Sequence, residues 1–424
     1  MYLRGSKLSL KQRHKKPNPW LVGFLALAIG ALVYLNIMVV PTIDPPFVPT
    51  PTPTRDPVSY EIEAEGSAAE GKYNAAISSY KLAINADPQN VMNYLNLAKL
   101  QIYTGNYEEA KVNAENAILL NKNFTQAYAI LAWAHGLQGD YLEGERVVKQ
   151  AIQIDINSAY AHATYAHILA LRVSDNVGEI GTVDLAIEES RTALALDPNL
   201  LESRWARGFV LEVTSNYAEA AQELEAANQI NDNISNLHLA LGRNYVALEE
   251  FDQAVFEFTK AYALNPTKPD PNFYISRVYG RLGEWAKAIQ YAEQAVKDDP
   301  ASPNLQANLG TMYFRNGQFN QALPYLELAV RGGTTQTGEV VTGIPLAYST
   351  SVIEIYSRYG LVLARVNRCN EAVQVAQAMI QGVPDDDTGV FNAEEMMRIC
   401  QENLDNPPTA TVAPTEAVTG TPSP

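Results

Sequence analysis

Residue types that carry out catalysis are present in this chain, but not at the spacings that catalysis needs. The sequence contains no phosphate loop of the G-x-x-x-x-G-K-[ST] type, no H-E-x-x-H and no G-x-S-x-G. His162 and His167 stand five residues apart, which does not place both on one helix face. Carboxylates are abundant but scattered, as at Glu108 and Glu109. We therefore expect no enzymatic activity, no metal site and no cofactor.

The dominant feature of the sequence is a repeated pattern of small and aromatic residues. The segment Leu282–Pro300, LGEWAKAIQYAEQAVKDDP, has a glycine, then Trp285, then three regularly spaced alanines, then a closing proline. The glycine recurs at a step of 34 residues (105 − 71 and 317 − 283), at Gly71, Gly105, Gly139, Gly283 and Gly317. Such a period predicts an array of stacked units rather than a single compact core.

The unit resembles the tetratricopeptide repeat family, whose 34-residue pattern is W-x2-L-G-x2-Y, then A-x3-F, then A and P. The agreement is close at Leu241, Gly242, Tyr245, Ala254, Phe258, Ala261 and Pro266. We identify about nine repeats between about Tyr60 and Pro384, and a capping helix over Phe391–Leu404. The resemblance implies an all-α fold, a right-handed superhelical solenoid of helix–turn–helix repeats. Each repeat buries its apolar face against its neighbours.

Two segments break the period. Repeat 4 carries about eight extra residues between Leu171 and Gly181, which predict a longer turn between its helices or a contact loop. Before repeat 9, the segment Arg331–Ile344 (RGGTTQTGEVVTGI) is rich in Gly and Thr and has no helical pattern. It is either an excursion over the concave groove or a tolerated insertion.

The N-terminus has the composition of a membrane anchor. Residues 20–40 contain no charge, and 21 helical residues are long enough to span a bilayer. Six basic residues and no acidic ones occur in residues 1–40, so we expect a cytoplasmic N-terminus and extracytoplasmic repeats. A cleaved signal peptide is the alternative. However, the stretch ends Ile37-Met38-Val39-Val40-Pro41, without the small residues of a cleavage site.

The predicted organisation therefore has five parts. A basic cytoplasmic tail (1–19) precedes a transmembrane helix (20–40) and a Pro/Thr-rich linker (41–57). The repeats and the capping helix occupy 58–404, and a Pro/Thr-rich tail (405–424) is expected to be disordered.

The net charge argues against nucleic acid as a partner. The whole chain carries −16 at pH 7, and residues 41–424 carry 25 − 47 = −22 once the six N-terminal basic residues are removed. Binding to nucleic acid needs a basic surface.

The resemblance also implies where a partner would bind. In the family, certain positions of the first helix of each repeat face the concave groove. At these positions stand Trp133, Trp205, Phe209, Arg243, Phe273, Arg277, Arg281, Phe314, Arg315 and Arg365. Aromatic residues and arginines are typical of binding surfaces. Five arginines in an acidic protein favour an anionic ligand, such as an acidic peptide or a C-terminal carboxylate. Two alternatives remain open: the aromatics pack on the next repeat, and the arginines pair with neighbouring glutamates.

Some family members clamp a terminal carboxylate with Lys, Asn and Arg at set positions. Asn308 and Arg358 stand at one such position in repeats 8 and 9, but Phe273 and Arg277 replace the Lys and Asn expected in repeat 7. We therefore expect no clamp of this kind.

The two cysteines are predicted to form a disulfide. Cys369 begins the second helix of repeat 9, and Cys400 lies near the end of the capping helix. Antiparallel packing of those helices would bring the two together, and an extracytoplasmic location permits oxidation. Two free thiols are the alternative, and no further Cys or His at ligand spacing supports zinc.

Together these features predict a membrane-anchored protein that binds a protein or peptide partner. The role that we expect is an extracytoplasmic scaffold or assembly factor. A noncatalytic subunit of a cell-envelope enzyme or secretion complex is the alternative. No small-molecule substrate is expected.

Overall fold

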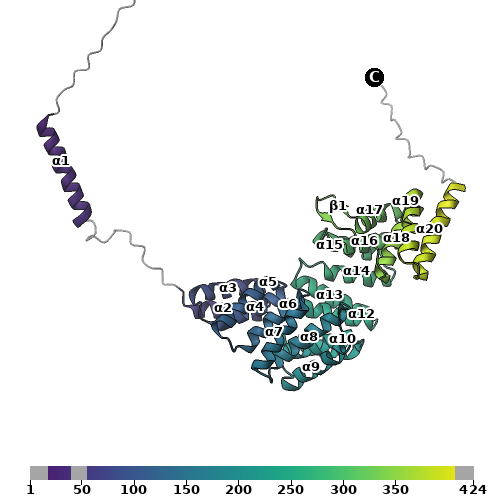
Figure 1. Ribbon diagram of the computed structural model, residues 1–424, viewed down its shortest axis with the longest axis horizontal. Helices are drawn as coiled ribbons and strands as arrows, with labels where there is room; N and C mark the ends of the chain where they lie inside the picture. The colour runs from purple at the N-terminus through teal and green to yellow at the C-terminus, as the bar shows by residue number, and fades with distance from the viewer. Residues whose placement is uncertain (1–17, 40–54, 406–424) are drawn as a thin grey trace, which may run out of the picture. The chain divides into compact units, whose positions relative to one another are not determined.

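The structure is a computed structural model that describes residues 18–39 and 55–405. It divides into two compact units, Met1–Arg55 and Asp56–Pro424, which we treat separately (Figure 1). The predicted basic tail, the Pro/Thr-rich linker and the C-terminal tail lie wholly or largely outside the described residues.

The first unit contains one apolar helix. Helix α1 spans Pro19–Tyr34 and continues as a π-helix, η1, over Leu35–Val39. The Asn18 side chain caps α1 by accepting a hydrogen bond from the backbone N–H of Trp20 at 3.2 Å, and Pro19 occupies the first turn, where a missing N–H costs nothing. The stretch Pro19–Met38 is long and apolar enough to cross a membrane, a property that signal sequences share.

The second unit is built from helices α2 to α20. Their bounds are α2 Pro57–Ala69, α3 Tyr73–Ala86, α4 Val91–Thr104, α5 Tyr107–Leu120, α6 Thr125–Leu137, α7 Tyr141–Ile154, α8 Ala159–Ser174, α9 Thr182–Leu196, α10 Leu201–Val213, α11 Tyr217–Ile230, α12 Ser235–Ala247, α13 Phe251–Leu264, α14 Asp270–Arg281, α15 Trp285–Asp298, α16 Pro303–Arg315, α17 Phe319–Arg331, α18 Thr350–Arg365, α19 Cys369–Gly382 and α20 Asp387–Asp405. Two short strands, β1 Gly333–Thr334 and β2 Val340–Val341, form an antiparallel hairpin.

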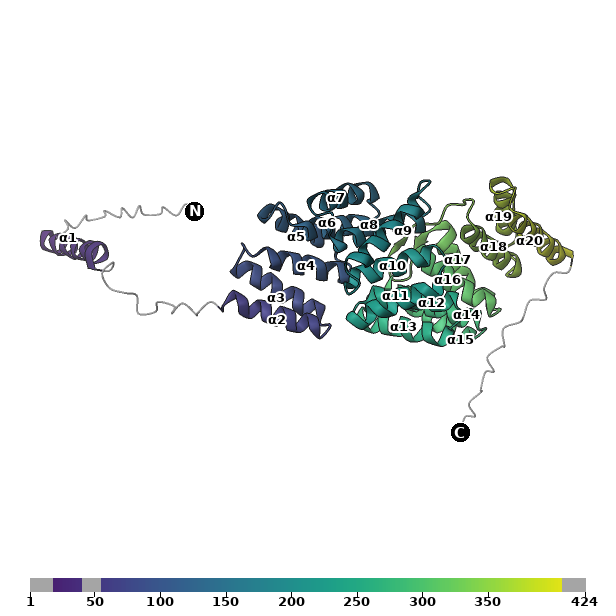
Figure 2. The same cartoon turned by 90° about the horizontal axis from the view of Figure 1, so that it is seen from below.

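Helices α2 to α19 form nine antiparallel pairs within the described residues, which we number repeat 1 (α2, α3) to repeat 9 (α18, α19). Each pair packs on the next, and the first helices of successive repeats also meet, as α6, α8 and α10 do. Figures 1 and 2 show the pairs following one another in chain order. The predicted all-α repeat fold is confirmed.

Small residues allow the two helices of a repeat to approach closely. In repeat 6, a Cβ atom added to Gly242 would lie 2.4 Å from the ring of Phe258, so only glycine fits there. Phe258, Ala254 and Ala261 on the facing helix are fully buried. The repeated glycine, alanines and aromatic residue therefore form one packing contact that recurs along the solenoid.

The turn inside most repeats contains a residue in the left-handed conformation. Gly105 in repeat 2 has φ +83° and ends α4, a conformation that glycine adopts without steric cost. Repeats 5, 6 and 9 place Ser215, Glu249 and Asn367 in the same conformation, with φ of 62–63°. Asparagine tolerates this region better than the other two residues do.

The solenoid also contacts itself between repeats distant in sequence. The hydroxyl of Tyr73 in repeat 1 is hydrogen-bonded to the side chain of Asn231 in the turn after repeat 5, at 3.0–3.2 Å. Gly71 lies against Asn233, and α4 contacts α12. The winding of the first repeats thus brings repeats 1 and 2 back against repeat 6.

The extra residues of repeat 4 lengthen α8 and form a loop over residues 175–181. Asp175 in that loop accepts a hydrogen bond from the hydroxyl of Tyr141 at 2.5 Å, and Arg172 forms ion pairs with Glu145 and Glu179. The insertion is therefore a longer turn attached to repeat 3.

The Gly/Thr-rich insertion before repeat 9 folds along one edge of the solenoid. After the β1–β2 hairpin, the backbone N–H of Ile344 donates to Ala329 C=O at 2.8 Å, and Tyr356 donates its hydroxyl proton to Ile344 C=O at 2.9 Å. Leu346 lies against Gly382 near the end of α19. These contacts hold the segment beside α17 and α19, as expected for a tolerated insertion.

Helix α20 closes the C-terminal end by packing on α18 and α19, and it extends further than the predicted Phe391–Leu404. Its Ala393, Met396 and Ile399 are buried. Cys369 at the start of α19 and Cys400 in α20 form a disulfide, with Cα atoms 5.4 Å apart. The covalent link fixes the cap on the last repeat.

Candidate functional site

The residues expected on the groove divide into two groups. In repeats 3 and 5, Trp133, Trp205 and Phe209 are only 3, 6 and 9% exposed. The rings of Trp133 and Trp205 lie 5.4 Å apart, and His167 lies 4.9 Å from Phe209 and 5.7 Å from Trp205. This corrects the expectation that these three aromatics face an open groove. The tight winding of the first repeats packs their inner faces together.

A buried histidine and a paired arginine complete this part of the inner face. Burial, together with the charge of Arg243, lowers the pKa of His167 to about 3, so the ring is neutral near neutral pH. Arg243 is half-buried, and its guanidinium donates to both carboxylate oxygens of Glu212, at 2.7 and 3.0 Å. Arg243 is therefore already bound to a glutamate, as one of the two alternatives proposed.

Phe314 and Arg365 do not line the cavity that the remaining groove residues share. The ring of Phe314 packs on Phe319 at 5.7 Å, between the helices of repeat 8. Arg365 lines a separate depression of about 420 Å³ beside residues 317–321 and Asn367. Neither residue lies with Arg277, Arg281 and Arg315.

The remaining groove residues meet in one cavity of about 830 Å³, which we call the arginine cavity. It is lined by the first helices of repeats 7, 8 and 9, namely α14, α16 and α18. Phe273, Arg277 and Arg281 come from α14, and Arg315 comes from α16, together with Asn304, Asn308 and Thr311. Helix α18 adds Ser351, Glu354, Ile355 and Arg358. None of residues 332–349 lines it, so the Gly/Thr-rich insertion is not an excursion over this groove.

The arginine cavity is positively charged in an acidic protein. Its lining has five basic side chains (Lys268, Arg277, Arg281, Arg315, Arg358) and three acidic ones (Asp270, Asp299, Glu354), a balance of 5 − 3 = +2. The whole chain carries −16. A concave region of opposite sign concentrates anions.

Most of these arginines have no acidic partner. Arg277, Arg281 and Arg315 form no ion pair within residues 18–39 and 55–405, and Arg277 instead lies over the ring of Phe273 at 5.5 Å. Arg358 is the exception, because its Nη2 contacts Glu354 Oε2 at 2.6 Å. Burial lowers the pKa of Arg358, Glu354 opposes this shift, and the charges of Arg315 and Arg277 add to it. Unpaired guanidinium groups offer several charge-assisted hydrogen bonds to an anion.

A polar side chain is fixed on the floor of the cavity. Asn308 is 9% exposed, and its amide donates to the hydroxyl of Ser276 on α14 at 3.1 Å. This contact orients the amide and links repeats 7 and 8. The sequence placed Asn308 and Arg358 at a clamp position, but did not indicate that Arg358 would join Arg277 and Arg315.

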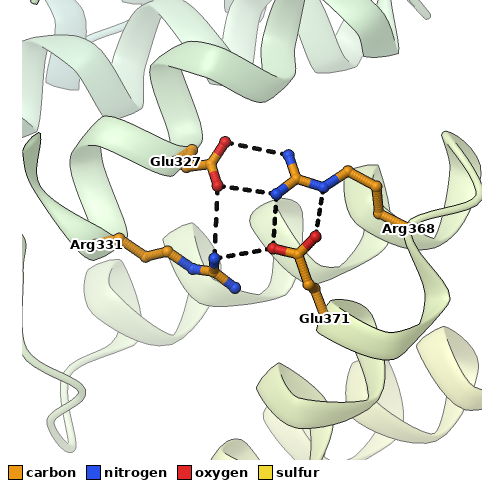
Figure 3. Close-up of polar contacts among 4 residues, drawn as sticks. All are labelled: Glu327, Arg331, Arg368 and Glu371. Carbon is orange, nitrogen blue, oxygen red and sulfur yellow. Dashed lines mark hydrogen bonds and ion pairs between the residues drawn. The ribbon is translucent and has the colours of Figure 1, made fainter.

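An ion-pair network joins α17 of repeat 8 to the start of α19 in repeat 9. Figure 3 shows Arg368 between Glu327 and Glu371, with Arg331 joining the same two carboxylates. Arg368 contacts Glu327 at 3.0–3.1 Å and Glu371 at 2.6 Å, and Arg331 contacts Glu371 at 2.8 Å. The guanidinium of Arg331 also lies over the ring of Tyr359 on α18, at 5.6 Å. The network thus ties repeat 8 to repeat 9, and Arg331 also contacts α18, the helix that carries Glu354 and Arg358.

Comparison with known families agrees with this architecture. Three family models, each described as tetratricopeptide repeat, match residues 67–134, 235–268 and 275–336. The tetratricopeptide repeat and J domain-containing co-chaperone DNJ1 of Cryptococcus neoformans var. grubii is 26% identical over 172 residues, which cover 40% of this chain and 31% of that protein. DnaJ homolog subfamily C member 7 of Mus musculus is 23% identical over 126 residues, covering 30% of this chain and 26% of that protein. The matches thus span less than two thirds of either relative.

Two solved structures are similar in part. The Pseudomonas aeruginosa pilF structure has a TM-score of 0.40 and 24% identity, covering 48% of this chain and 90% of that chain. The yeast Tom70 structure has a TM-score of 0.40 and 11% identity, covering 82% of this chain and 96% of that chain.

Proposed function

We propose that this chain, a tetratricopeptide repeat protein, binds an acidic segment of a partner protein in the arginine cavity. Protein–protein interaction is the role that its repeats support. The observation that carries the finer proposal is the set of three arginines, Arg277, Arg281 and Arg315, that line one cavity without an acidic partner among the described residues.

The chemistry of the cavity matches an extended acidic peptide. Four guanidinium groups distributed over three helices can bind carboxylates spaced along a chain, since each helix contributes its own donors. Phe273 and Ile355 add apolar contact area beside the charges. Asn308, held by Ser276, adds a directed polar group that can bond the peptide backbone.

The direct test measures binding of labelled hexaglutamate to the full-length chain in detergent micelles. Changing Arg277, Arg281 and Arg315 together to Glu should weaken binding at least about ten-fold, because charge-assisted contacts become repulsive. The matched control changes Lys81, Lys122 and Lys297 to Glu, three exposed residues outside the cavity. Both variants alter the net charge by −6, so a loss confined to the first places the site in the cavity. Equal losses, or no binding by the wild type, would contradict the proposal.

Two further probes define the ligand. Hexaglutamate with an amidated C-terminus tests whether the terminal carboxylate is needed, and hexaglutamine tests whether side-chain charge is needed. An acidic segment requires that the amidated peptide bind and that hexaglutamine fail. A dependence on the free terminus alone would assign the cavity to a C-terminal carboxylate instead.

We also propose that residues 20–40 anchor the protein and that the repeats work outside the cytoplasm as a scaffold or assembly factor. The six basic residues before the apolar helix and the Cys369–Cys400 disulfide support this orientation. A reporter that is active only outside the cytoplasm, fused after residue 405, should be active. An inactive fusion would indicate that the repeats lie in the cytoplasm.

A noncatalytic subunit of a larger envelope complex is the second candidate. It is favoured by the small depression at Arg365, which provides a second surface apart from the arginine cavity. A partner that co-purifies at a fixed stoichiometry and survives the triple Arg→Glu change would support the subunit role over a peptide-binding scaffold.

A further inference from the structure

One acidic side chain that lines the arginine cavity is bound to one of the cavity arginines. Asp270, Asp299 and Glu354 all line the space, but within the described residues only Glu354 forms an ion pair with one of the cavity arginines. Its Oε2 lies 2.6 Å from Nη2 of Arg358. The distance is that of a charge-assisted hydrogen bond.

The two partners differ in their freedom to move. The side chain of Arg358 is 16% exposed, whereas that of Glu354 is 50% exposed. Both stand on α18, one turn apart, so the contact is an i,i+4 pair that forms without any other element. Glu354 can therefore rotate into solvent at little cost, while Arg358 stays in the wall of the cavity.

The electrostatic surroundings of Arg358 explain why it keeps a carboxylate nearby. The positive charges of Arg315 and Arg277 lower the pKa of Arg358 by repulsion, and the carboxylate of Glu354 opposes this shift. An incoming carboxylate would relieve the same repulsion. A ligand carboxylate and Glu354 thus offer Arg358 the same chemical group, and a ligand that reaches Nη2 meets the donor that Glu354 already occupies.

We propose that Glu354 is an internal competitor, which holds Arg358 while the cavity is empty and is displaced by a carboxylate of the bound segment. The inference rests on the proposed function of the arginine cavity. It assigns Glu354 a role in setting affinity: the residue weakens binding of acidic segments, so that only those with enough carboxylates to engage the remaining arginines are held.

The experiment compares hexaglutamate binding by the full-length wild type and Glu354→Gln in detergent micelles. The glutamine is close in shape but carries no charge, so Arg358 loses its charge-assisted partner with little change in packing. We expect the dissociation constant to fall roughly three- to ten-fold, the effect of releasing one charge-assisted contact. An unchanged or larger dissociation constant would overturn the inference, since Glu354 would then be inert or would help to present Arg358.

Loss of any negative charge near the cavity could also strengthen anion binding, so a second comparison isolates the contact. Asp299→Asn removes another cavity carboxylate that is not bound to an arginine, and it retains an oxygen to accept the Ala301 N–H. Competition for Arg358 predicts a larger gain in Glu354→Gln than in Asp299→Asn. Equal gains would show a general charge effect and contradict the proposal.

The decisive step repeats Glu354→Gln in an Arg358→Gln background. Without Arg358 there is nothing to compete for, so the gain should fall to that of Asp299→Asn. A full gain in that background overturns the inference. Failure of the two proposals is distinguishable: no hexaglutamate binding by the wild type contradicts the proposed function, whereas wild-type binding without the Glu354→Gln gain contradicts only the internal competitor.

Discussion

The inner faces of repeats 1–6 and repeats 7–9 are built from the same helix positions but have opposite character. In the first region, aromatic rings such as Trp133 and Trp205 fill the inner face, and Arg243 is bound to Glu212. In the second region, the corresponding positions line an open cavity of about 830 Å³ with unpaired arginines. The first region uses its inner face for stability, and the second leaves its inner face available for a ligand.

The difference arises from winding rather than from the repeat itself. Repeat 1 contacts the turn after repeat 5 through the hydrogen bonds between Tyr73 and Asn231. The inner faces of the repeats between these two points therefore pack closely. The first helices of repeats 7–9 surround the cavity instead. A concave binding surface in such a solenoid therefore exists only where successive turns leave space.

The largest expected effect is the loss of an inner ring from the first region. Trp133→Ala should lower the free energy of unfolding by about 3–5 kcal/mol, because a large buried side chain leaves a cavity among packed rings. Urea titration followed by far-UV circular dichroism measures the change. Hexaglutamate binding by the protein that remains folded should be unchanged.

The matching change in the second region should have the reverse outcome. Arg315→Gln removes an exposed side chain without an ion pair among the described residues, so stability should change by no more than about 0.5 kcal/mol while hexaglutamate binding weakens. If Arg315→Gln destabilised the protein as strongly as Trp133→Ala, the contrast between the two inner faces would be wrong.

The packing between the helices of one repeat should, by contrast, be equally strict in both regions. A Cβ at Gly242 meets Phe258 at 2.4 Å, and a Cβ at Gly310 in repeat 8 meets Leu326 at 2.6 Å. Gly242→Ala and Gly310→Ala should each cost about 1–3 kcal/mol through overpacking, measured by urea titration. Gly66→Ala, where nothing lies within 4 Å of the added atom, is the control and should be neutral or stabilising. Unequal losses would mean that the regions differ in more than their inner faces.

The sequence predicted the repeats well because their signal is local. The alanines and glycines of each turn must contact a partner within the same 34-residue unit, so the pattern alone fixes the nine helix pairs. The cysteine pair was likewise inferred from the ends of two neighbouring helices. The groove was harder to predict, since the family pattern says which side of a helix faces inward but not how tightly successive repeats wind.

That limit explains which site residues were misplaced. Trp133, Trp205 and Phe209 are buried because rings from neighbouring repeats pack against one another in front of them. Arg358 was considered only at a clamp position. The insertion before repeat 9 interrupts the 34-residue period, so the sequence did not show that Arg358 would line the same cavity as Arg277 and Arg315. Both errors concern relations between repeats, which a pattern within one repeat does not contain.

The inner face of the first region should also make stability depend on pH. Burial lowers the pKa of His167 to about 3, so below about pH 6.5 the unfolded chain binds a proton that the folded chain does not. Stability is then lost as the pH falls from about 6.5 towards 3, by roughly 1 kcal/mol for each pH unit. Urea titrations between pH 7 and pH 5 should give a smaller acid loss for His167→Phe than for the wild type.

His162 on the same helix supplies a comparison of opposite sign. The hydrogen bond to Glu189 raises the pKa of His162, against the effect of burial. The stabilisation that His162 adds to the folded state is therefore complete below about pH 6.5, and it is lost as the pH rises through the folded-state pKa. His162→Gln should lose more stability at pH 5 than at pH 8, whereas a common slope for both variants would rule out these assignments.

The smallest expected effect concerns the turns that lack glycine. Glu249 in repeat 6 has φ +62° and Asn367 in repeat 9 has φ +63°. Glu249→Gly should stabilise the protein by about 0.5–1 kcal/mol, because glycine adopts this conformation without steric cost. Asn367→Gly should gain less, since asparagine already tolerates the left-handed region. Glu249→Ala is the control: it removes the same side chain but keeps a Cβ, so thermal denaturation should show no gain. Equal gains in Glu249→Gly and Glu249→Ala would attribute the effect to the lost negative charge. The turn at Glu249 would then be no more strained than the turn at Asn367.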